Sequence, residues 1–131
     1  MYRPALISGV LLAALAVILG AFGAHSLKPL LTEEQLNIFE KGAQYQFYHA
    51  FALIATGIIY SSFPVRQVRI ATTFFLLGVI LFSGSLYALT ILKMQGEVGL
   101  GGVGILTPIG GTCFIIGWIL LLIAVIKKQT S

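Results

Sequence analysis

The sequence has little charge and a single cysteine, and both shortages exclude whole classes of protein. Of its 131 residues, 9% are charged, whereas an ordinary globular domain carries roughly 25% charged residues. The low charge therefore indicates that most of the folded chain is not exposed to water. The lone Cys113 excludes a framework of disulfide bonds within the chain and any metal motif based on cysteine.

The eight basic and four acidic residues all lie outside four hydrophobic segments, residues 4–27, 42–65, 70–92 and 98–126. An α-helix rises about 1.5 Å per residue, so about twenty apolar residues cross a bilayer core of about 30 Å. Each segment is long enough to cross once and too short to cross twice. In lipid, backbone polar groups must pair within their own segment, so the segments are helical. The alternative, a soluble all-helical bundle, conflicts with the low charge.

These segments predict an all-α fold, an integral membrane four-helix bundle that forms a single domain over residues 1–131. A short amphipathic helix at the membrane interface is expected between helices 1 and 2. There, Thr32 and Gln35 have the spacing of a capping box, with Glu33 and Glu34 in the first turn. The predicted membrane helices cover about residues 5–24, 45–63, 70–92 and 107–126, and the predicted interfacial helix covers about 32–44.

The first helix carries small residues on one stripe, where helix backbones approach closely in membranes: Gly9, Ala13, Ala16, Gly20 and Ala24. A cleaved signal peptide is the alternative for this segment, since Arg3 precedes an apolar run that ends in small residues. The run is about twice as long as a signal core of 7–15 residues, so we expect a retained helix.

The basic residues predict the orientation of the chain rather than contact with nucleic acid. With four crossings, one side of the membrane holds five basic residues and the other side holds Lys28, Lys41 and Lys93. The more basic side faces the cytoplasm, so both termini are expected there. The five residues on that side are Arg3, Arg66, Arg69, Lys127 and Lys128.

Glycines fill the connection before the fourth helix, where residues 99–104 match the dinucleotide-binding pattern G-x-G-x-x-G. That pattern binds a nucleotide only between a strand and a helix, and here it lies between two membrane segments. We therefore interpret it as a flexible loop. Thr107 is the expected cap of the fourth helix, with Pro108 in its first turn.

Polar side chains gather in one half of the predicted bundle, because alternate helices run in opposite directions. Along the second helix, Tyr45, His49, Ala52, Thr56 and Tyr60 share one face, so His49 should point inward. Polar groups at membrane depth either bond across helices or line a wet cavity. The candidate binding cluster consists of His25, Gln44, Tyr45, Gln46, Tyr48, His49, Ser83, Ser85, Tyr87 and Thr107.

Three interpretations of this cluster stay open at the level of sequence. The side chains bond the helices together, or they form a small solute site or conduit around His49. In the third, His25 and His49 hold a haem or a metal, but two histidines alone are weak evidence, so no cofactor, no metal and no catalytic residue is predicted. No carboxylate lies within a predicted membrane helix and no Ser–His–acid group is visible there, so we do not expect an enzyme.

Several short motifs occur in order along nearly the whole chain: residues 20–25 (GAFGAH), Tyr45-Gln46 followed by Tyr48-His49, residues 81–87 (LFSGSLY), and residues 107–111 (TPIGG) followed by Gly117-Trp118. In these motifs the chain resembles the "domain of unknown function 423" family of small bacterial inner-membrane proteins, whose eukaryotic relatives are called transmembrane protein 256.

The resemblance implies a four-helix protein of the bacterial inner membrane with a retained first helix, and it implies no activity, because the family has none established. The expected role is that of an accessory or structural protein acting through helix–helix contacts. Its expected partners are the lipid bilayer and either a second copy or another membrane protein.

Overall fold

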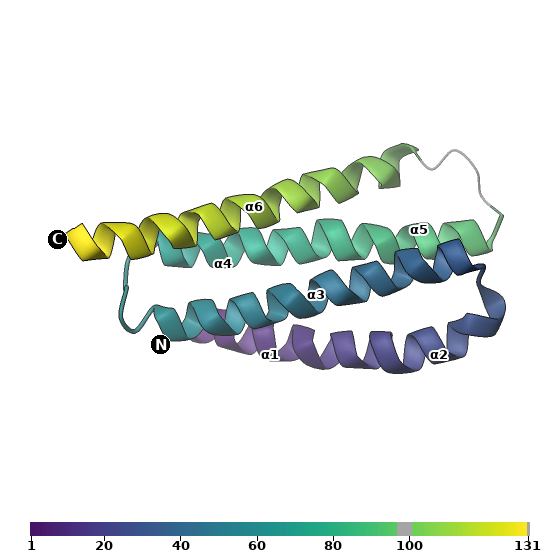
Figure 1. Ribbon diagram of the computed structural model, residues 1–131, viewed down its shortest axis with the longest axis horizontal. Helices are drawn as coiled ribbons and strands as arrows, with labels where there is room; N and C mark the ends of the chain where they lie inside the picture. Colours follow the sequence, from purple (N-terminus) through teal and green to yellow (C-terminus); the bar gives the residue numbers. More distant parts are fainter. Residues whose placement is uncertain (97–100, 131) are drawn as a thin grey trace.

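Every element of secondary structure in the described part of the chain is helical. The computed structural model describes residues 1–96 and 101–130. The elements join into four helical rods that lie along the same long axis, with the two termini at the same end of the molecule (Figure 1). The helical class predicted from the four hydrophobic segments is therefore confirmed.

The first rod is longer than the predicted helix over residues 5–24. It consists of α1 (Arg3–Val17), a π-helical turn η1 (Ile18–Gly23), α2 (Ala24–Leu27) and a 3₁₀ turn η2 (Lys28–Leu30). Pro4 lies in the first turn of α1, where its missing N–H removes no intrahelical bond.

The second rod is one continuous helix, α3 (Glu33–Ile59). Its capping box is confirmed, because the Thr32 hydroxyl accepts from the Gln35 backbone at 3.2 Å and the Gln35 side chain accepts from the Thr32 backbone at 3.1 Å. The interfacial helix predicted over about 32–44 was expected to run into the second helix over about 45–63, and α3 covers both without a break, ending at Ile59. No proline interrupts α3, and Gly42 is buried against the Tyr87 ring, so the helix continues through this region.

Loss of the Thr32 cap should lower stability measurably. In Thr32→Ala the Gln35 backbone N–H loses its partner, and we expect the free energy of unfolding to fall by about 1 kcal/mol. Unfolding in mixed micelles with rising dodecyl sulfate, followed by circular dichroism, measures this change. Thr32→Ser is the matched control and should stay near wild type, because serine keeps the hydroxyl; equal loss in both variants would contradict the capping role.

The third rod consists of α4 (Arg66–Gly78), a π-helical turn η3 (Val79–Ser83) and α5 (Gly84–Met94). It begins four residues before the predicted start of residues 70–92. A turn that contains Pro64 joins it to α3. The rod ends at Gly96, whose φ of 77° is a left-handed conformation that glycine adopts without steric cost.

The fourth rod is α6 (Gly101–Thr130), and its predicted start at Thr107 is wrong. Pro108 lies inside α6 rather than in its first turn. The predicted glycine loop is partly helical, since Gly102 and Gly104 belong to α6, whereas Gly99 lies outside the described residues. Glycine weakens a helix only by about 1 kcal/mol per residue, so apolar neighbours in the same helix can outweigh its local preference.

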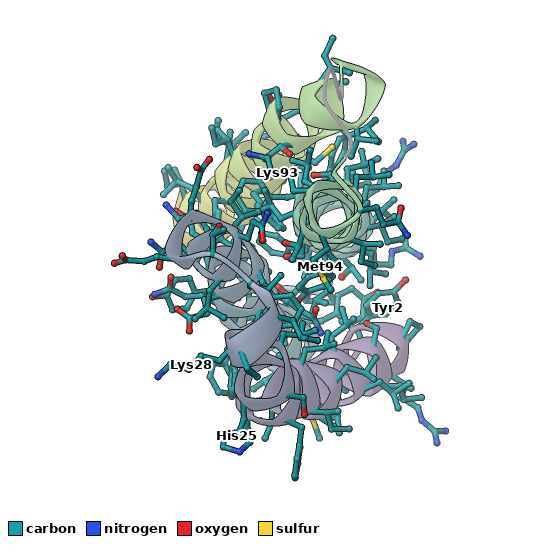
Figure 2. The ribbon with its side chains drawn as sticks, turned by 90° about the vertical axis from the view of Figure 1, so that its right-hand side faces the viewer. Tyr2, His25, Lys28, Lys93 and Met94 are labelled. Atoms are coloured by element: carbon teal, nitrogen blue, oxygen red, sulfur yellow. The ribbon has the colours of Figure 1, made fainter. Side chains whose placement is uncertain are left out.

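The rods pack in sequence order, α1 on α3, α3 on the α4–η3–α5 rod, and that rod on α6. Figure 2, which looks at one end of the molecule, shows this succession. The most deeply buried large side chains, Phe75, Leu53 and Val68, lie where α3 and α6 meet the third rod. The third rod is thus the centre of the core, and α1 forms one edge of the molecule.

Glycines set the closest contacts between rods. A Cβ added to Gly110 would overlap the backbone of Phe82, and one added to Gly117 would lie 2.7 Å from the Phe75 ring. On the other side, a Cβ on Gly9 would lie 2.8 Å from the Ala50 carbonyl oxygen. The α1–α3 and α6–third rod interfaces therefore depend on the missing side chains, as the small-residue stripe of the first helix predicts for Gly9.

Much of the outer surface is apolar, and three of the rods are long and apolar enough to cross a membrane. Among the described residues these are Arg3–Leu30, Arg66–Met94 and Gly102–Lys127. Large hydrophobic side chains such as Ile80 and Leu122 are more than half exposed. In a soluble protein an apolar surface of this extent would be a contact surface, and here lipid can cover it.

Candidate functional site

His49 lies at the centre of the candidate site, and α3 turns it inward. Its side chain is 5% exposed. Its Nδ1 lies 2.8 Å from the Tyr45 carbonyl oxygen, and its Nε2 lies 3.2 Å from the indole Nε1 of Trp118 on α6. The indole N–H can only donate, so Nε2 accepts and Nδ1 carries the proton. Both contacts are satisfied by the neutral imidazole in this one tautomer.

Aromatic rings surround the imidazole. His49 stacks on Phe114 with the ring centroids 3.5 Å apart and the planes 7° apart. Trp118 presents its ring at 60° to His49 with a centroid distance of 5.9 Å. Tyr45 stacks on Phe82 of η3 at 4.7 Å. Three rods thus contribute rings to one cluster, which fixes the orientation of His49 by packing as well as by hydrogen bonds.

A groove of about 430 Å³ runs beside this cluster, between α3 and α6. Trp118 lies on its wall and is 48% exposed. The groove exists because α3 and α6 each pack against the third rod rather than tightly against each other. It is lined by Tyr45, His49, Pro108, Gly111, Thr112, Phe114, Ile115 and Trp118.

Gln46 forms the second polar centre and joins three rods. Its side chain is 3% exposed. The amide nitrogen donates to the Leu12 carbonyl oxygen of α1 at 2.9 Å, and the amide oxygen accepts from the Tyr87 hydroxyl of α5 at 2.7 Å. Both ends of this buried amide are therefore used in bonds between helices.

The two serines of the third rod bond to its neighbours on either side. Ser83 donates to the Gly42 carbonyl oxygen of α3 at 2.7 Å. Ser85 and Thr107 of α6 place their hydroxyl oxygens 2.6 Å apart. Thr107 was predicted as a helix cap, but its hydroxyl bonds across to the third rod instead. Among the described residues, no buried side-chain nitrogen or oxygen lacks a partner.

The structure does not bring all ten predicted residues together. Gln44 and Tyr48 form an exposed pair on α3, with Gln44 Nε2 2.6 Å from the Tyr48 hydroxyl. Gln44 and Tyr48 are four residues apart and share one face of α3, whereas Gln46 lies two residues from each of them and therefore points to the opposite side, where His49 is also buried. His25 is exposed near the end of the first rod and points away from the other rods (Figure 2).

The position of His25 leaves His49 without a second histidine. The paired-histidine interpretation required both rings at one site, and their placement does not support it. Over residues 1–96 and 101–130, no three His, Cys, Asp or Glu side chains are grouped so that they could hold a metal ion. The remaining predicted residues lie in the His49 groove or in the hydrogen bonds around Gln46, Ser83 and Ser85.

Several contributors to the site were absent from the sequence prediction, among them Trp118, Phe114 and the Leu12 carbonyl oxygen. Trp118 and Phe114 lie one turn apart on α6, and their spacing with Gly111 would place all three on one face. That spacing could have predicted from the sequence that these residues face the same site. The Leu12 carbonyl oxygen gave no signal, because a backbone acceptor has no side chain to identify it.

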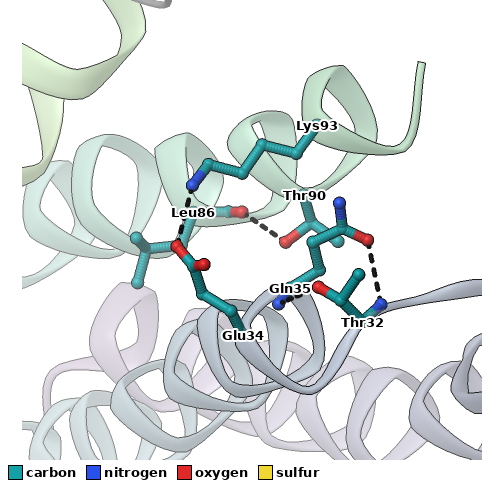
Figure 3. Close-up of polar contacts among 6 residues, drawn as sticks. All are labelled: Thr32, Glu34, Gln35, Leu86, Thr90 and Lys93. Atoms are coloured by element: carbon teal, nitrogen blue, oxygen red, sulfur yellow. Dashed lines mark hydrogen bonds and ion pairs between the residues drawn. The ribbon is translucent and has the colours of Figure 1, made fainter. Parts of the chain in front are cut away.

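A charged patch lies at the end of the molecule where α3 begins and α5 ends. Lys93 reaches Glu34 at 3.2 Å, next to the Thr32 capping box (Figure 3). The Glu34 side chain is 76% exposed, so water screens this pair and it adds little to stability. Its position instead marks this end as a polar boundary of the apolar rods.

Comparison with known proteins agrees with the membrane character of the chain. The family model described as "Protein of unknown function (DUF423)" matches residues 19–111. The UPF0382 membrane protein SAB0533 of Staphylococcus aureus is 42% identical over 93% of this chain and 94% of its own. A UPF0382 membrane protein of Staphylococcus epidermidis is 40% identical over 93% and 94%, and YwdK of Bacillus subtilis is 37% identical over 93% and 95%. No solved structure matches the chain.

Proposed function

Because the chain belongs to the DUF423 family, whose bacterial relatives are membrane proteins, we propose that it is a four-span protein of the bacterial plasma membrane. Its proposed role is that of an accessory or structural protein acting through helix–helix contacts. The observation that carries this proposal is the use of the buried polar groups. Gln46 and Ser83 bond to neighbouring rods, and Ser85, whose proton goes to the Phe82 carbonyl oxygen of its own rod, accepts from Thr107 of α6; such bonds between helices stabilise bundles in membranes.

The fourth crossing is α3, which is less apolar than the other three rods. Its 27 residues extend about 40 Å, enough to cross a core of about 30 Å. It lies along α1 and the third rod over their shared length, so it occupies the same membrane depth. Its polar side chains Gln46 and His49 are buried, Gln46 between α1 and α5 and His49 against aromatic rings of α4 and α6.

Accessible cysteines at the two rod connections test the four-span topology. In a Cys113→Ser background, Ser62→Cys and Gln95→Cys place single thiols on exposed positions at opposite ends of the third rod. With intact cells, we expect a membrane-impermeant maleimide to label Gln95→Cys and to reach Ser62→Cys only after lysis, because the basic residues predict cytoplasmic termini. Labelling of both from one side would contradict the topology.

The face of α1 opposite α3 is the proposed contact surface, with a second copy as its partner. Because α1 is at the edge of the molecule, its outward side chains Val10 and Leu11 are more than half exposed, and Leu15 is nearly so. Another helix can replace lipid there, since packing rather than water exclusion drives helix association in membranes.

Single-molecule photobleaching in sparse vesicles measures this self-association. With one dye on Ser62→Cys, we expect two bleaching steps in most occupied vesicles above the random co-occupancy level. Leu11→Ala with Leu15→Ala should lower the two-step fraction severalfold, because the packing area is lost. The matched control, Ile119→Ala with Leu122→Ala on the exposed face of α6, should leave it unchanged. A single step at every protein density would contradict self-association.

A second candidate function is the binding of a small solute around His49. The observation that favours it is the groove of about 430 Å³ beside the imidazole. The groove opens at the side of the molecule, between α3 and α6, so a solute would enter from the lipid rather than pass through the protein. This geometry favours a binder over a conduit.

A further inference from the structure

We propose that the α3–α6 groove binds the head group of a neutral, flat, lipid-soluble molecule that carries a carbonyl oxygen, which is the chemistry of a quinone. This inference rests on the second candidate function, because it names the ligand class of the groove around His49. It concerns binding alone.

The shape of the groove fits a flat ring. Its volume of about 430 Å³ lies within the range of about 300–1,000 Å³ for small-molecule sites. Trp118 and Phe114 supply ring surfaces, and aromatic groups gain energy by stacking in offset or edge-on contact. Gly111 also lines the groove, and a Cβ there would meet only the Phe82 ring, at 3.9 Å, so the missing side chain leaves room in the groove.

The charge of the groove excludes ionic ligands. None of its eight lining residues is Lys, Arg, Asp or Glu, and His49 is held as the neutral imidazole by its two contacts. An unpaired charge in an apolar environment is costly, so a phosphate, a carboxylate or a metal ion would gain no partner here. A neutral molecule that already dissolves in lipid meets no such cost.

The hydrogen-bonding groups of the groove favour a ligand that carries a hydrogen-bond acceptor. The described residues provide no hydrogen bond to the Tyr45 hydroxyl, although this residue lines the groove. The other donors are occupied: the Trp118 indole donates to His49, and the Thr112 hydroxyl donates to the Pro108 carbonyl oxygen at 2.9 Å. A ligand carbonyl would accept a hydrogen bond from the Tyr45 hydroxyl, which is a donor that no described residue of the chain engages.

The test uses the fluorescence of Trp118, the single tryptophan of the chain, which lies on the groove wall. The purified full-length protein in phosphatidylcholine vesicles is titrated with decylubiquinone. We expect saturable quenching of Trp118. The variant Gly111→Leu should remove the saturable component by filling the groove. Gly104→Leu is the matched control on the same helix, where a Cβ meets nothing within 4 Å, and it should keep saturable quenching.

Two further arms separate the ligand class from the site. Tyr45→Phe keeps the ring and removes the donor, so we expect binding about fivefold to tenfold weaker; unchanged affinity would overturn the role of the carbonyl. Decylbenzene has the same chain without carbonyl groups, and in competition it should not displace the quinone. If decylbenzene competes equally well, the groove binds apolar molecules generally and the quinone inference fails while the second candidate function stands. Linear quenching that is identical in all variants overturns both.

Discussion

Replacing Gly110 by alanine should be among the most destabilising single methyl additions in this protein. The new Cβ would overlap the Phe82 backbone nitrogen and lie 2.8 Å from its Cα. Those are main-chain atoms of η3, so no side-chain rotation relieves the overlap, and α6 must move away from the third rod. Overpacking costs about 1–3 kcal/mol, and we expect a value near the top of that range in dodecyl sulfate unfolding followed by circular dichroism.

The control for Gly110→Ala lies in the same helix. At Gly104 a Cβ meets nothing within 4 Å, and alanine favours the helix by about 1 kcal/mol over glycine. Gly104→Ala should therefore be neutral or stabilising. The two substitutions add the same methyl group, so the difference between them reports the contact with Phe82. Equal stability in both variants would show that α6 and η3 do not approach as closely as described.

The sequence best predicted the features that depend on residues within one or two helical turns. The spacing along α3 predicted that His49 shares an inward face with Tyr45, Ala52, Thr56 and Tyr60; His49, Ala52 and Thr56 are buried, and the two tyrosines are half-buried. The capping box at Thr32 was equally legible, because both of its hydrogen bonds are local. Local rules of this kind depend on neighbours within one turn, which a sequence displays directly.

Features that depend on contacts between rods could not be predicted from the sequence. The start of α6 at Gly101 was missed because glycine and proline locally indicate a loop, whereas the apolar helix continues through them. The π-helical turn over Val79–Ser83 was missed because an extra residue in one turn leaves no compositional trace.

In the polar cluster, too, the sequence predicted which residues lie in the same half of the molecule but not which of them contact one another. Opposed helix directions correctly place Gln46, Ser85 and Tyr87 in one half of the molecule, but direction alone does not say which pairs bond. Gln44 and Tyr48 share that half with them, yet they lie on the exposed face of α3. Position along the long axis of the molecule is therefore predictable from the order and direction of the helices, whereas rotation about each helix axis is set by packing between the rods.

Replacing Gln46 by leucine should uncouple α1 and α5 from α3. The change removes the bonds to the Leu12 carbonyl oxygen and the Tyr87 hydroxyl, and it leaves that half-buried hydroxyl without its acceptor. Bonds between membrane helices average about 0.6 kcal/mol and reach about 1.7 kcal/mol, and an unpaired buried donor adds to the loss. We expect the free energy of unfolding to fall by about 1–3 kcal/mol, measured by dodecyl sulfate titration.

The neighbouring glutamine provides the matched control for Gln46→Leu. Gln44 is exposed and bonds only within α3, to Tyr48, so Gln44→Leu should change stability by less than about 0.5 kcal/mol. Combining Gln46→Leu with Tyr87→Phe should cost less than the sum of the single changes, because the second substitution removes the donor that the first left unpaired. Strict additivity would mean that Gln46 and Tyr87 do not bond, and an equal loss in Gln44→Leu would mean that the buried amide has no special role in joining the rods.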